Sequence, residues 1–315
     1  MVVEESTLLS FIEQGLEVAK AIPEYFSKYS NKIYTNHQHI VLVVLKQKLR
    51  TTWRDLIEII KITIIPQKIG LKKIPNFTTL IKFSKKLSPS LINNLLSYST
   101  SLSKPKILKL GVDATGLELD NASKHYAKIL DKDTTRKDVI QVTACGLMDT
   151  LLISSARVER YNVVRNNNFL PLVEESSKLG KVDFVAADKG YDAHNNHKFV
   201  MLDLMAKSLI KLKNVSTKRR NWRKNYRKIA AKQFDEKLYH QRSKIETIFS
   251  MVKRRYGATI KWKSRETQVQ EGFHKLLTHN LDRLCKIISK LFEGFIRAGH
   301  SESLPLIYVG QKQRT

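Results

Sequence analysis

The stretch that decides the fold reads Tyr239-His-Gln-Arg-Ser-Lys-Ile-Glu-Thr-Ile-Phe-Ser-Met-Val-Lys253. It contains neither Gly nor Pro, which predicts a helix of about four turns. At about 100° per residue, one narrow stripe of this helix carries four polar side chains: Tyr239, Arg242, Glu246 and Lys253. The adjoining stripe is apolar and would pack on a sheet or another helix: Leu238, Ile245, Ile248, Phe249, Val252 and Tyr256. Glu246 is therefore expected at the margin of a core, where a partly desolvated charge needs a cation or a hydrogen-bond partner.

Two interpretations of this polar stripe are open. Arg242 and Glu246 could form an ordinary ion pair, four residues apart on a solvated helix face, as most such pairs do. Alternatively, the stripe faces a charged ligand, because it borders the apolar face and also carries an aromatic ring and a second basic residue. One carboxylate holds a divalent metal ion poorly, so the second interpretation requires carboxylates from elsewhere in the chain.

Length and charge limit the classes of protein that this chain can belong to. With 315 residues, 42% of them apolar, it can bury a large core and a smaller one, so two domains or one domain with an appendage are expected. The 56 Lys and Arg against 29 Asp and Glu give a net charge of +27, which indicates a polyanionic partner. No apolar run approaches the ~20 residues of a spanning helix and no signal peptide is evident, so no membrane partner is expected. Two widely spaced cysteines, Cys145 and Cys285, favour buried thiols in a reducing, cytoplasmic compartment.

Residues 1–104 are expected to form an all-helical, DNA-binding N-terminal region. Apolar residues recur at helical spacing from Leu8, from about His39, after Thr52 and after Asn76. The last two helices, joined by a connection with Gly and Pro and edged with lysines, could form a helix-turn-helix that binds duplex DNA. A small helical bundle with solvated lysines is the alternative. The polar stretch Ser97–Pro105 is predicted to be a linker at the domain boundary.

Residues 105–292 have the pattern of an α/β domain, and residues 293–315 are an uninformative tail. An apolar strand ends at Asp113, a hairpin covers 138–158, a helix covers 168–178, and another apolar strand ends at Asp188. A helix near Phe199 and a strand over 208–212 precede the helix that carries Glu246. This order predicts an RNase H-like core, a mixed sheet flanked by helices.

Three acids of this domain could meet at one point. Taken singly, Asp113 and Asp188 could each simply start a turn. In the RNase H-like order, however, the ends of the first and fourth strands lie side by side, and Glu246 would approach from the helix above the sheet. Three such carboxylates supply the hard oxygen ligands that Mg²⁺ prefers. Two ions roughly 4 Å apart would activate a water or a 3′-hydroxyl at a phosphodiester and stabilise the leaving oxygen.

A basic insertion, at about residues 213–237, precedes the deciding stretch. From Lys207 to Lys232 there are eleven basic residues and no Asp or Glu, with Trp222 and Tyr226 among them. Such a run is often a solvated or disordered face. Rings among cations beside a phosphodiester site favour DNA binding instead, through charge neutralisation and base stacking. The candidate DNA-binding residues are Arg219, Arg220, Trp222 and Arg223, with Arg254 after the helix. The later His274 and His279 are interpreted as structural or surface residues, because no partner spacing supports a metal site.

Three motifs together carry a family resemblance. Tyr239, Arg242, Glu246 and Lys253 match the signature Y-(2)-R-(3)-E-(6)-K at every position. Asp113-Ala-Thr-Gly and Ala187-Asp188-Lys-Gly-Tyr-Asp192 precede it in order. In these motifs, over roughly residues 52–290, the chain resembles the DDE transposases of prokaryotic insertion sequences, in the insertion-sequence-five group.

The resemblance implies an enzyme dependent on Mg²⁺ or Mn²⁺, with two ions, that cuts at the terminal inverted repeats of its element and joins the 3′ ends to target DNA. Asp113, Asp188 and Glu246 would be the catalytic, metal-binding triad. Tyr239, Arg242 and Lys253 would contact the transposon-end DNA, at its phosphates or a flipped base. Double-stranded DNA is then the partner, and a homodimer is expected because two ends must be brought together. The alternatives are an RNase H-like nuclease without strand transfer and a catalytically silent DNA-binding relic.

Overall fold

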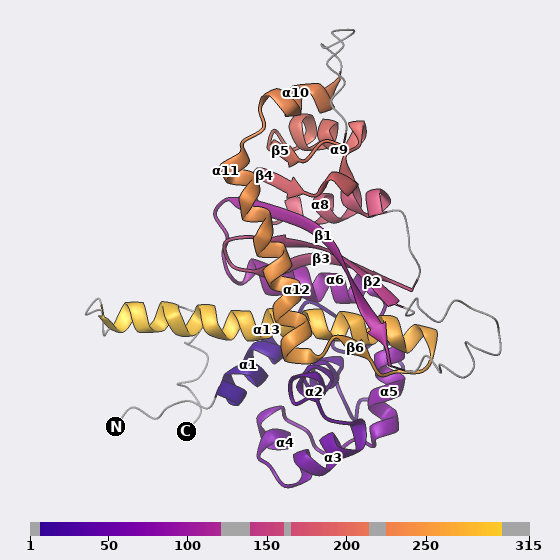
Figure 1. Ribbon diagram of the computed structural model, residues 1–315. Helices are drawn as coiled ribbons and strands as arrows, with labels where there is room; N and C mark the ends of the chain where they lie inside the picture. The colour runs from indigo at the N-terminus through magenta and orange to yellow at the C-terminus, as the bar shows by residue number, and fades with distance from the viewer. Residues whose placement is uncertain (1–6, 121–138, 161–164, 214–224, 298–315) are drawn as a thin grey trace, which may run out of the picture.

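A six-stranded mixed sheet lies at the centre of the molecule (Figure 1). The computed structural model describes residues 7–120, 139–160, 165–213 and 225–297. Its strands are β1 (Leu108–Leu119), β2 (Val139–Leu147), β3 (Leu152–Glu159), β4 (Val182–Ala187), β5 (Lys207–Ile210) and β6 (Thr259–Ile260). They lie in the order β3-β2-β1-β4-β5, and β6 pairs with β1. The pairs β1–β2 and β2–β3 are antiparallel, whereas β1–β4, β4–β5 and β1–β6 are parallel. This mixed sheet with flanking helices confirms the predicted RNase H-like core.

Both faces of the sheet are covered by helices, so the central strands are apolar almost throughout. One face packs against α8 (Phe169–Ser177) and the segment α9 (His194–Lys198) with η3 (Phe199–Asp203). The other face packs against α12 (Ser243–Tyr256) and α13 (Arg265–Arg297). Alternation along β1 sends Leu110 and Val112 to the α8 face. Gly111 faces Ile245 of α12 on the opposite side, and Asp113, two residues further on, shares that side.

Helix α12 lies close to the sheet because two glycines face it. Gly111 of β1 and Gly146 of β2 are directly paired in the antiparallel register. A Cβ at Gly146 would lie 2.9 Å from Ile248 Cδ1 and 3.1 Å from Ile245 Cδ1. A Cβ at Gly111 would lie 3.3 Å from Ile245 Cβ. This glycine seat, Gly111 and Gly146, therefore sets the distance between the sheet and α12, and α12 carries Glu246.

The deciding stretch is helical, but it is not the single helix that the sequence predicts. It consists of α11 (Glu236–Tyr239), the 3-10 turn η5 (His240–Arg242) and α12. Asp235 caps α11 by accepting a hydrogen bond from the Leu238 amide at 3.1 Å. The predicted apolar face of α12 is buried: Ile245, Ile248, Phe249, Val252 and Tyr256. Gly257, with φ of 89°, ends the helix in a conformation that favours glycine.

The N-terminal region is helical, as predicted. Its helices are α1 (Thr7–Ala19), α2 (Asn36–Lys48), α3 (Trp53–Lys61), α4 (Ile65–Lys68), α5 (Phe77–Lys86) and α6 (Pro89–Ser101). Asn76 caps α5 by accepting a hydrogen bond from the Thr78 amide at 3.0 Å. The predicted linker Ser97–Pro105 is wrong over its first half, because α6 continues to Ser101. Ser99 and Thr100 are fully buried, and the Thr100 hydroxyl donates to the Ile153 carbonyl of β3.

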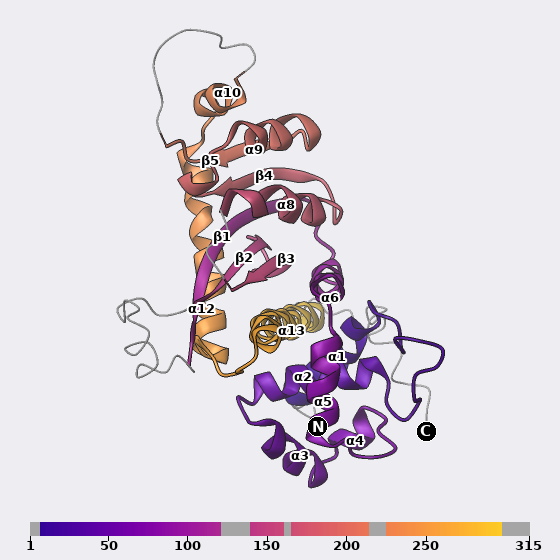
Figure 2. The same cartoon turned by 90° about the vertical axis from the view of Figure 1, so that its right-hand side faces the viewer.

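Helix α13 joins the N-terminal helices to the sheet. Figure 2 shows it nearly end-on, between the sheet above and α1, α2 and α5 below. One apolar cluster contains Phe11 and Leu95 from the N-terminal region, Val142 from the sheet and Leu277 from α13. The predicted boundary near residue 104 therefore does not separate two hydrophobic cores. Within the described ranges, no helix is both long and apolar enough to cross a membrane.

The remaining elements connect the sheet to its helices. They are η1 (Arg165–Asn168), η2 (Lys189–Tyr191) and α10 (Tyr226–Lys232). The predicted strand over 208–212 is β5. The helix expected near Phe199 is present as α9 followed by the wider π-helical turn η3.

Candidate active site

Asp113 and Asp188 lie next to each other because their strands pair in parallel. The last pair of the β1–β4 ladder is Val112 with Ala187, so the following residue of each chain segment is an aspartate. The prediction that β1 ends at Asp113 is wrong, because β1 continues to Leu119 with β2 and then β6 as partners. It is β4 that ends at this point, at Ala187. Asp113 therefore lies beside the end of β4, and Asp188 is the first residue of the loop that follows β4.

The electrostatic environment of Asp113 reflects its neighbours. Burial is the main cause that raises the pKa of Asp113, and the carboxylates of Asp188 and Glu246 raise it further. A hydrogen bond from the Ala114 amide and the charge of Arg242 act in the opposite direction. Asp188 and Glu246 are therefore both close enough to Asp113 to influence its ionisation.

Arg242 links the sheet to α12. Its Nη2 lies 2.6 Å from Glu246 Oε1, and its Nη1 lies 3.6 Å from Asp113 Oδ2. The Asp113 side chain is 14% exposed, and that of Glu246 is 52% exposed. Glu246 is thus not the partly desolvated group that the sequence predicts. In this pair Arg242, at 22% exposure, is the more buried partner and is the one that also lies near Asp113.

Tyr239 is the most buried member of the polar stripe. Its ring belongs to a small apolar cluster with Phe184 and Leu209 of the sheet. The guanidinium carbon of Arg242 lies 5.9 Å from the ring centroid, and Lys211 Nζ lies 5.8 Å from it. Burial raises the pKa of Tyr239, while Arg242 lowers it. The guanidinium of Arg242 therefore contacts the ring of Tyr239 and the carboxylates of Asp113 and Glu246.

The remaining predicted DNA contacts are farther from this cluster. Lys253 lies two turns along α12 from Glu246, which corresponds to about 10 Å, and is half-buried. Arg254 is exposed beside it. Four predicted contacts lie outside the described residues: Arg219, Arg220, Trp222 and Arg223.

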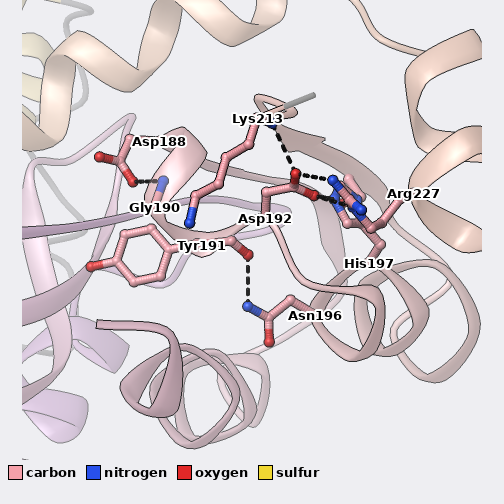
Figure 3. Close-up of polar contacts among 9 residues, drawn as sticks. Asp188, Gly190, Tyr191, Asp192, Asn196, His197, Lys213 and Arg227 are labelled. Atoms are coloured by element: carbon pink, nitrogen blue, oxygen red, sulfur yellow. Dashed lines mark hydrogen bonds and ion pairs between the residues drawn. The ribbon is translucent and has the colours of Figure 1, made fainter. Parts of the chain in front are cut away.

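The loop after β4 is shaped by the second aspartate motif. Asp188 accepts a hydrogen bond from the Gly190 amide at 2.7 Å and so caps η2 (Figure 3). A Cβ at Gly190 would lie 2.7 Å from Asp188 Oδ1, so a larger residue would displace the carboxylate. The glycine therefore belongs to the geometry of Asp188.

Asp192, four residues after Asp188, is a site residue that sequence reasoning missed. Its carboxylate is fully buried and accepts hydrogen bonds from Arg227 Nε at 2.7 Å and Nη2 at 2.5 Å (Figure 3). It also accepts from the Lys213 amide at 2.9 Å, and it lies 3.2 Å from His197 Nε2. Burial alone would raise the pKa of Asp192, but the hydrogen bonds of Arg227 and Lys213 lower it. Asp192 thus ties the loop that follows Asp188 to the end of β5 and to α10. Its position in Ala187-Asp-Lys-Gly-Tyr-Asp192 was the available signal.

The donor set suits a hard divalent cation in part. Asp113 and Asp188 are carboxylates that follow the last pair of two neighbouring strands, and carboxylates are the type of ligand that Mg²⁺ or Mn²⁺ takes in proteins. Among the described residues, no three His, Cys, Asp or Glu side chains are arranged to hold one ion. The guanidinium of Arg242 lies between Asp113 and Glu246 instead. The two aspartates therefore suit a divalent cation, whereas the side chain of Arg242 separates Glu246 from Asp113.

Both histidines of α13 are structural, as predicted. His274 is buried, and its Nε2 lies 3.2 Å from Ser84 Oγ. His279 Nε2 lies 2.9 Å from the Leu151 carbonyl oxygen. Burial lowers the pKa of His274 to about 3 and that of His279 to about 4, so both are neutral at pH 7.

Comparison with known proteins shows the family of the chain. The model of the family described as "Transposase DDE domain" matches residues 104–281, which is more than half of the chain. A search of curated proteins found no match. Among solved structures, the chain is similar to a piggyBac transposase in a synaptic complex with hairpin DNA, determined by cryo-electron microscopy. The similarity has a TM-score of 0.44 and 8% sequence identity, and covers 94% of this chain and 77% of that one. On the strength of the family match, the chain belongs to the transposase DDE domain family.

Proposed function

We propose that this transposase binds the terminal inverted repeats of an insertion sequence of the insertion-sequence-five group, cuts at the ends and joins the 3′ ends to target DNA. The observation that carries the proposal is the position of two acids that are far apart in sequence: Asp113 and Asp188 follow the last residue pair of two neighbouring parallel strands. Glu246 is linked to Asp113 through Arg242. A cluster of negative charge at the margin of a strongly basic chain suits a phosphodiester substrate with bound cations.

Asp113 and Asp188 would hold a divalent ion, Mg²⁺ or Mn²⁺, and Glu246 would complete the set of ligands for two ions. Such ions polarise a phosphodiester and lower the pKa of a bound water or hydroxyl. The protein's own contribution is to fix the two aspartates rigidly, one on a central strand and the other through the Gly190 amide. Arg242 neutralises the cluster when DNA is not bound, since its guanidinium pairs with two of the three carboxylates.

DNA would be bound by the basic surface around this cluster. Tyr239, Arg242 and Lys253 follow the family signature and would contact the transposon end. Arg254 lies exposed beside Lys253 on the same helix. The net charge of +27 supports tight, salt-dependent binding along the phosphate backbone. Two such chains, one on each end of the element, would form the active complex.

The test is an assay with purified protein, Mg²⁺ and labelled DNA that carries the ends of the element. The variants are Asp113→Asn, Asp188→Asn and Glu246→Gln, and the matched control is Glu236→Gln, an exposed acid on the neighbouring helix α11. We expect each of the three to reduce cleavage on the order of 100-fold or more, while the gel shift on DNA changes less than about threefold. The control should cleave at the wild-type rate.

The products distinguish the alternatives. Joined products indicate a transposase, cut ends without joining indicate a nuclease, and a gel shift alone indicates a protein that only binds DNA. Equal loss of binding and cleavage in Glu246→Gln would contradict its role as a metal ligand. Binding of Mn²⁺, followed by electron paramagnetic resonance in the absence of DNA, gives a second measurement. It should weaken in Asp113→Asn and Asp188→Asn but not in Glu236→Gln.

A further inference from the structure

A cavity of about 250 Å³ lies at the opposite end of α12 from Glu246. Its walls come from the end of α2, the start of α3, the segment between α12 and α13, and α13 itself. Six lining residues matter for its chemistry: Lys46, Arg50, Trp53, Lys261, Trp262 and Lys275. None of them belongs to the candidate active site.

The cavity carries an excess of positive charge. Four of its lining residues are basic, whereas Glu271 is the acid among them. Glu271 already has partners, because its Oε2 accepts the Lys261 amide at 2.8 Å and the Trp262 amide at 3.1 Å. Its Oε1 lies 3.8 Å from Lys275 Nζ. Lys46 and Arg50 add two further positive charges at the wall of this half-enclosed space, which suits an anion.

Burial and the neighbouring positive charges lower the pKa of Lys275. Its side chain is 1% exposed, and its Nζ donates to the Gly257 carbonyl at 2.8 Å and to the Thr259 carbonyl at 2.6 Å. Burial, and then the charges of Lys46, Lys261 and Arg50, lower the pKa of Lys275 to about 8, although Glu271 raises it. An anion in the cavity would relieve this repulsion.

The backbone brings two of the cations together. A Cβ at Gly257 would lie 3.6 Å from Lys275 Nζ and 3.9 Å from Arg50 Nη2. Arg50, with a φ of 54°, follows the C-cap of α2, where a left-handed residue is common, and the Thr51 amide closes the helix end by donating to the Lys46 carbonyl at 3.3 Å. The Arg50 guanidinium and the Lys275 ammonium thus both lie near Gly257.

Two tryptophans add a surface for an aromatic ring. The rings of Trp53 and Trp262 have centroids 5.7 Å apart, and Lys46 Nζ lies 5.4 Å from the Trp53 ring. The indole nitrogen of Trp53 is buried and has no hydrogen-bond partner within the described part of the chain. A buried donor without a partner is rare in folded proteins. A ligand that presents a hydrogen-bond acceptor beside a flat ring would satisfy it.

We propose that this cavity holds one unpaired nucleotide of a DNA strand, with the phosphate near Arg50, Lys46 and Lys275 and the base beside Trp53 and Trp262. Cations and aromatic rings in one pocket are the combination that binds single-stranded nucleic acid. The inference rests on the proposed function, which supplies the DNA. On helix α12, Glu246 and the cavity residue Tyr256 are ten residues apart, which corresponds to about 15 Å. At about 3.4 Å per nucleotide, a strand at Glu246 reaches the cavity roughly four to five nucleotides away.

The test measures tryptophan fluorescence of the full chain during titration with a thymidine hexanucleotide at fixed salt. The background is Trp222→Phe, which leaves only the two cavity tryptophans. The variants are Lys46→Met and Arg50→Gly, and the control is Lys85→Met, which removes a charge from the exposed side of α5. Glycine adopts the φ of residue 50 without strain, so Arg50→Gly keeps the fold. We expect the oligonucleotide to quench the fluorescence, with a Kd at least tenfold weaker in both cavity variants and within twofold in the control.

Equal Kd values in Arg50→Gly and Lys85→Met would overturn the inference, even if the wild-type protein cuts DNA as proposed. Inorganic phosphate is the second probe: binding as tight as that of the hexanucleotide would show that the cavity takes a free anion and not a nucleotide, which also overturns it. In Glu246→Gln we expect unchanged quenching together with lost cleavage. This result separates the cavity from the proposed active site.

Discussion

Replacing Gly146 by alanine tests whether the glycine seat sets the position of Glu246. The added Cβ would lie 2.9 Å from Ile248 Cδ1 and 3.1 Å from Ile245 Cδ1, whereas carbon atoms in ordinary contact are about 3.5–4.0 Å apart. It would also lie 3.2 Å from the Leu152 carbonyl oxygen, which belongs to the sheet and cannot retreat. Because both contacts are with the ends of isoleucine side chains, either these side chains change rotamer or α12 moves away from the sheet by roughly 0.5–1 Å, and the second outcome is the one that displaces Glu246.

Two effects of different size should follow. Overpacking of this kind costs about 1–3 kcal/mol of unfolding free energy, partly offset by about 0.5–1 kcal/mol because alanine loses less backbone entropy than glycine on folding. The effect on catalysis should be larger, since a displacement of about 1 Å at a catalytic group can cost on the order of 100-fold in rate. We expect a loss of about 1–2 kcal/mol in urea denaturation. Single-turnover cleavage should fall by roughly 10- to 100-fold.

Gly116→Ala is the matched control on the same sheet. A Cβ at Gly116 would make ordinary contacts with Val139, at 3.5, 3.6 and 3.8 Å. Its unfolding free energy should stay within about 0.5 kcal/mol of the wild type, with an unchanged cleavage rate. Adding Ile248→Val to Gly146→Ala removes the closest atom, Ile248 Cδ1, and should recover part of the lost rate. If Gly146→Ala cleaves DNA as fast as Gly116→Ala, the seat does not position Glu246 and the reasoning is refuted.

Three further predictions concern charge, buried hydrogen bonds and metal. In Asp192→Asn the buried partner of Arg227 is lost, so urea denaturation at pH 7 should show a loss of about 3 kcal/mol. The folded pKa of Asp192 is lowered, so its stabilising effect is present above the unfolded value near 4 and disappears as pH falls through the folded value; the difference from the wild type should shrink below about pH 4. Asn280→Leu removes hydrogen bonds to the Ile153 amide and carbonyl, at 2.9 and 2.7 Å, and should cost about 2–4 kcal/mol in the same measurement. Mg²⁺ should raise the thermal unfolding temperature of the wild type but not of Asp188→Asn, because a bound ligand stabilises only the state that binds it.

Each of these has a control and a contradicting result. Asp203→Asn, on an exposed position of η3, should not change the pH dependence of stability; an equal shift in both variants would remove the special role of Asp192. Lys290→Met, exposed on α13, should unfold like the wild type. A neutral Asn280→Leu would mean that its hydrogen bonds contribute no net stability. Protection of Asp188→Asn by Mg²⁺ would mean that the ion binds elsewhere.

Much of the sheet could be predicted from the sequence because apolar runs and a tight hairpin are local signals. The limits of β1 could not be predicted, because its last residues pair with β6, which comes more than a hundred residues later in the chain. Ser99 and Thr100 were taken for part of a linker because they are polar. Their partners, Leu96, Ile153 and Asn280, lie mostly in other elements and are visible only in the fold.

The sequence predicts the acids of the candidate site, but not the turn before α12 or the role of Asp192. Asp113 and Asp188 end up adjacent because parallel pairing of two apolar strands is a strong constraint. The 3-10 turn over residues 240–242 interrupts the predicted helix, and side-chain periodicity alone does not predict such a turn. Asp192 was not recognised because its partners, Lys213 and Arg227, lie well beyond it in sequence.

Helix α13 has a consequence for how the protein is made. It packs against the N-terminal helices and the sheet, and it is synthesised after every other element of the described chain. Until α13 has left the ribosome, the apolar side chains of α1, α2, α6 and the sheet that pack against it remain exposed. The emerging chain should therefore stay partly open to chaperones and proteases until α13 has been made, and then close in one late step.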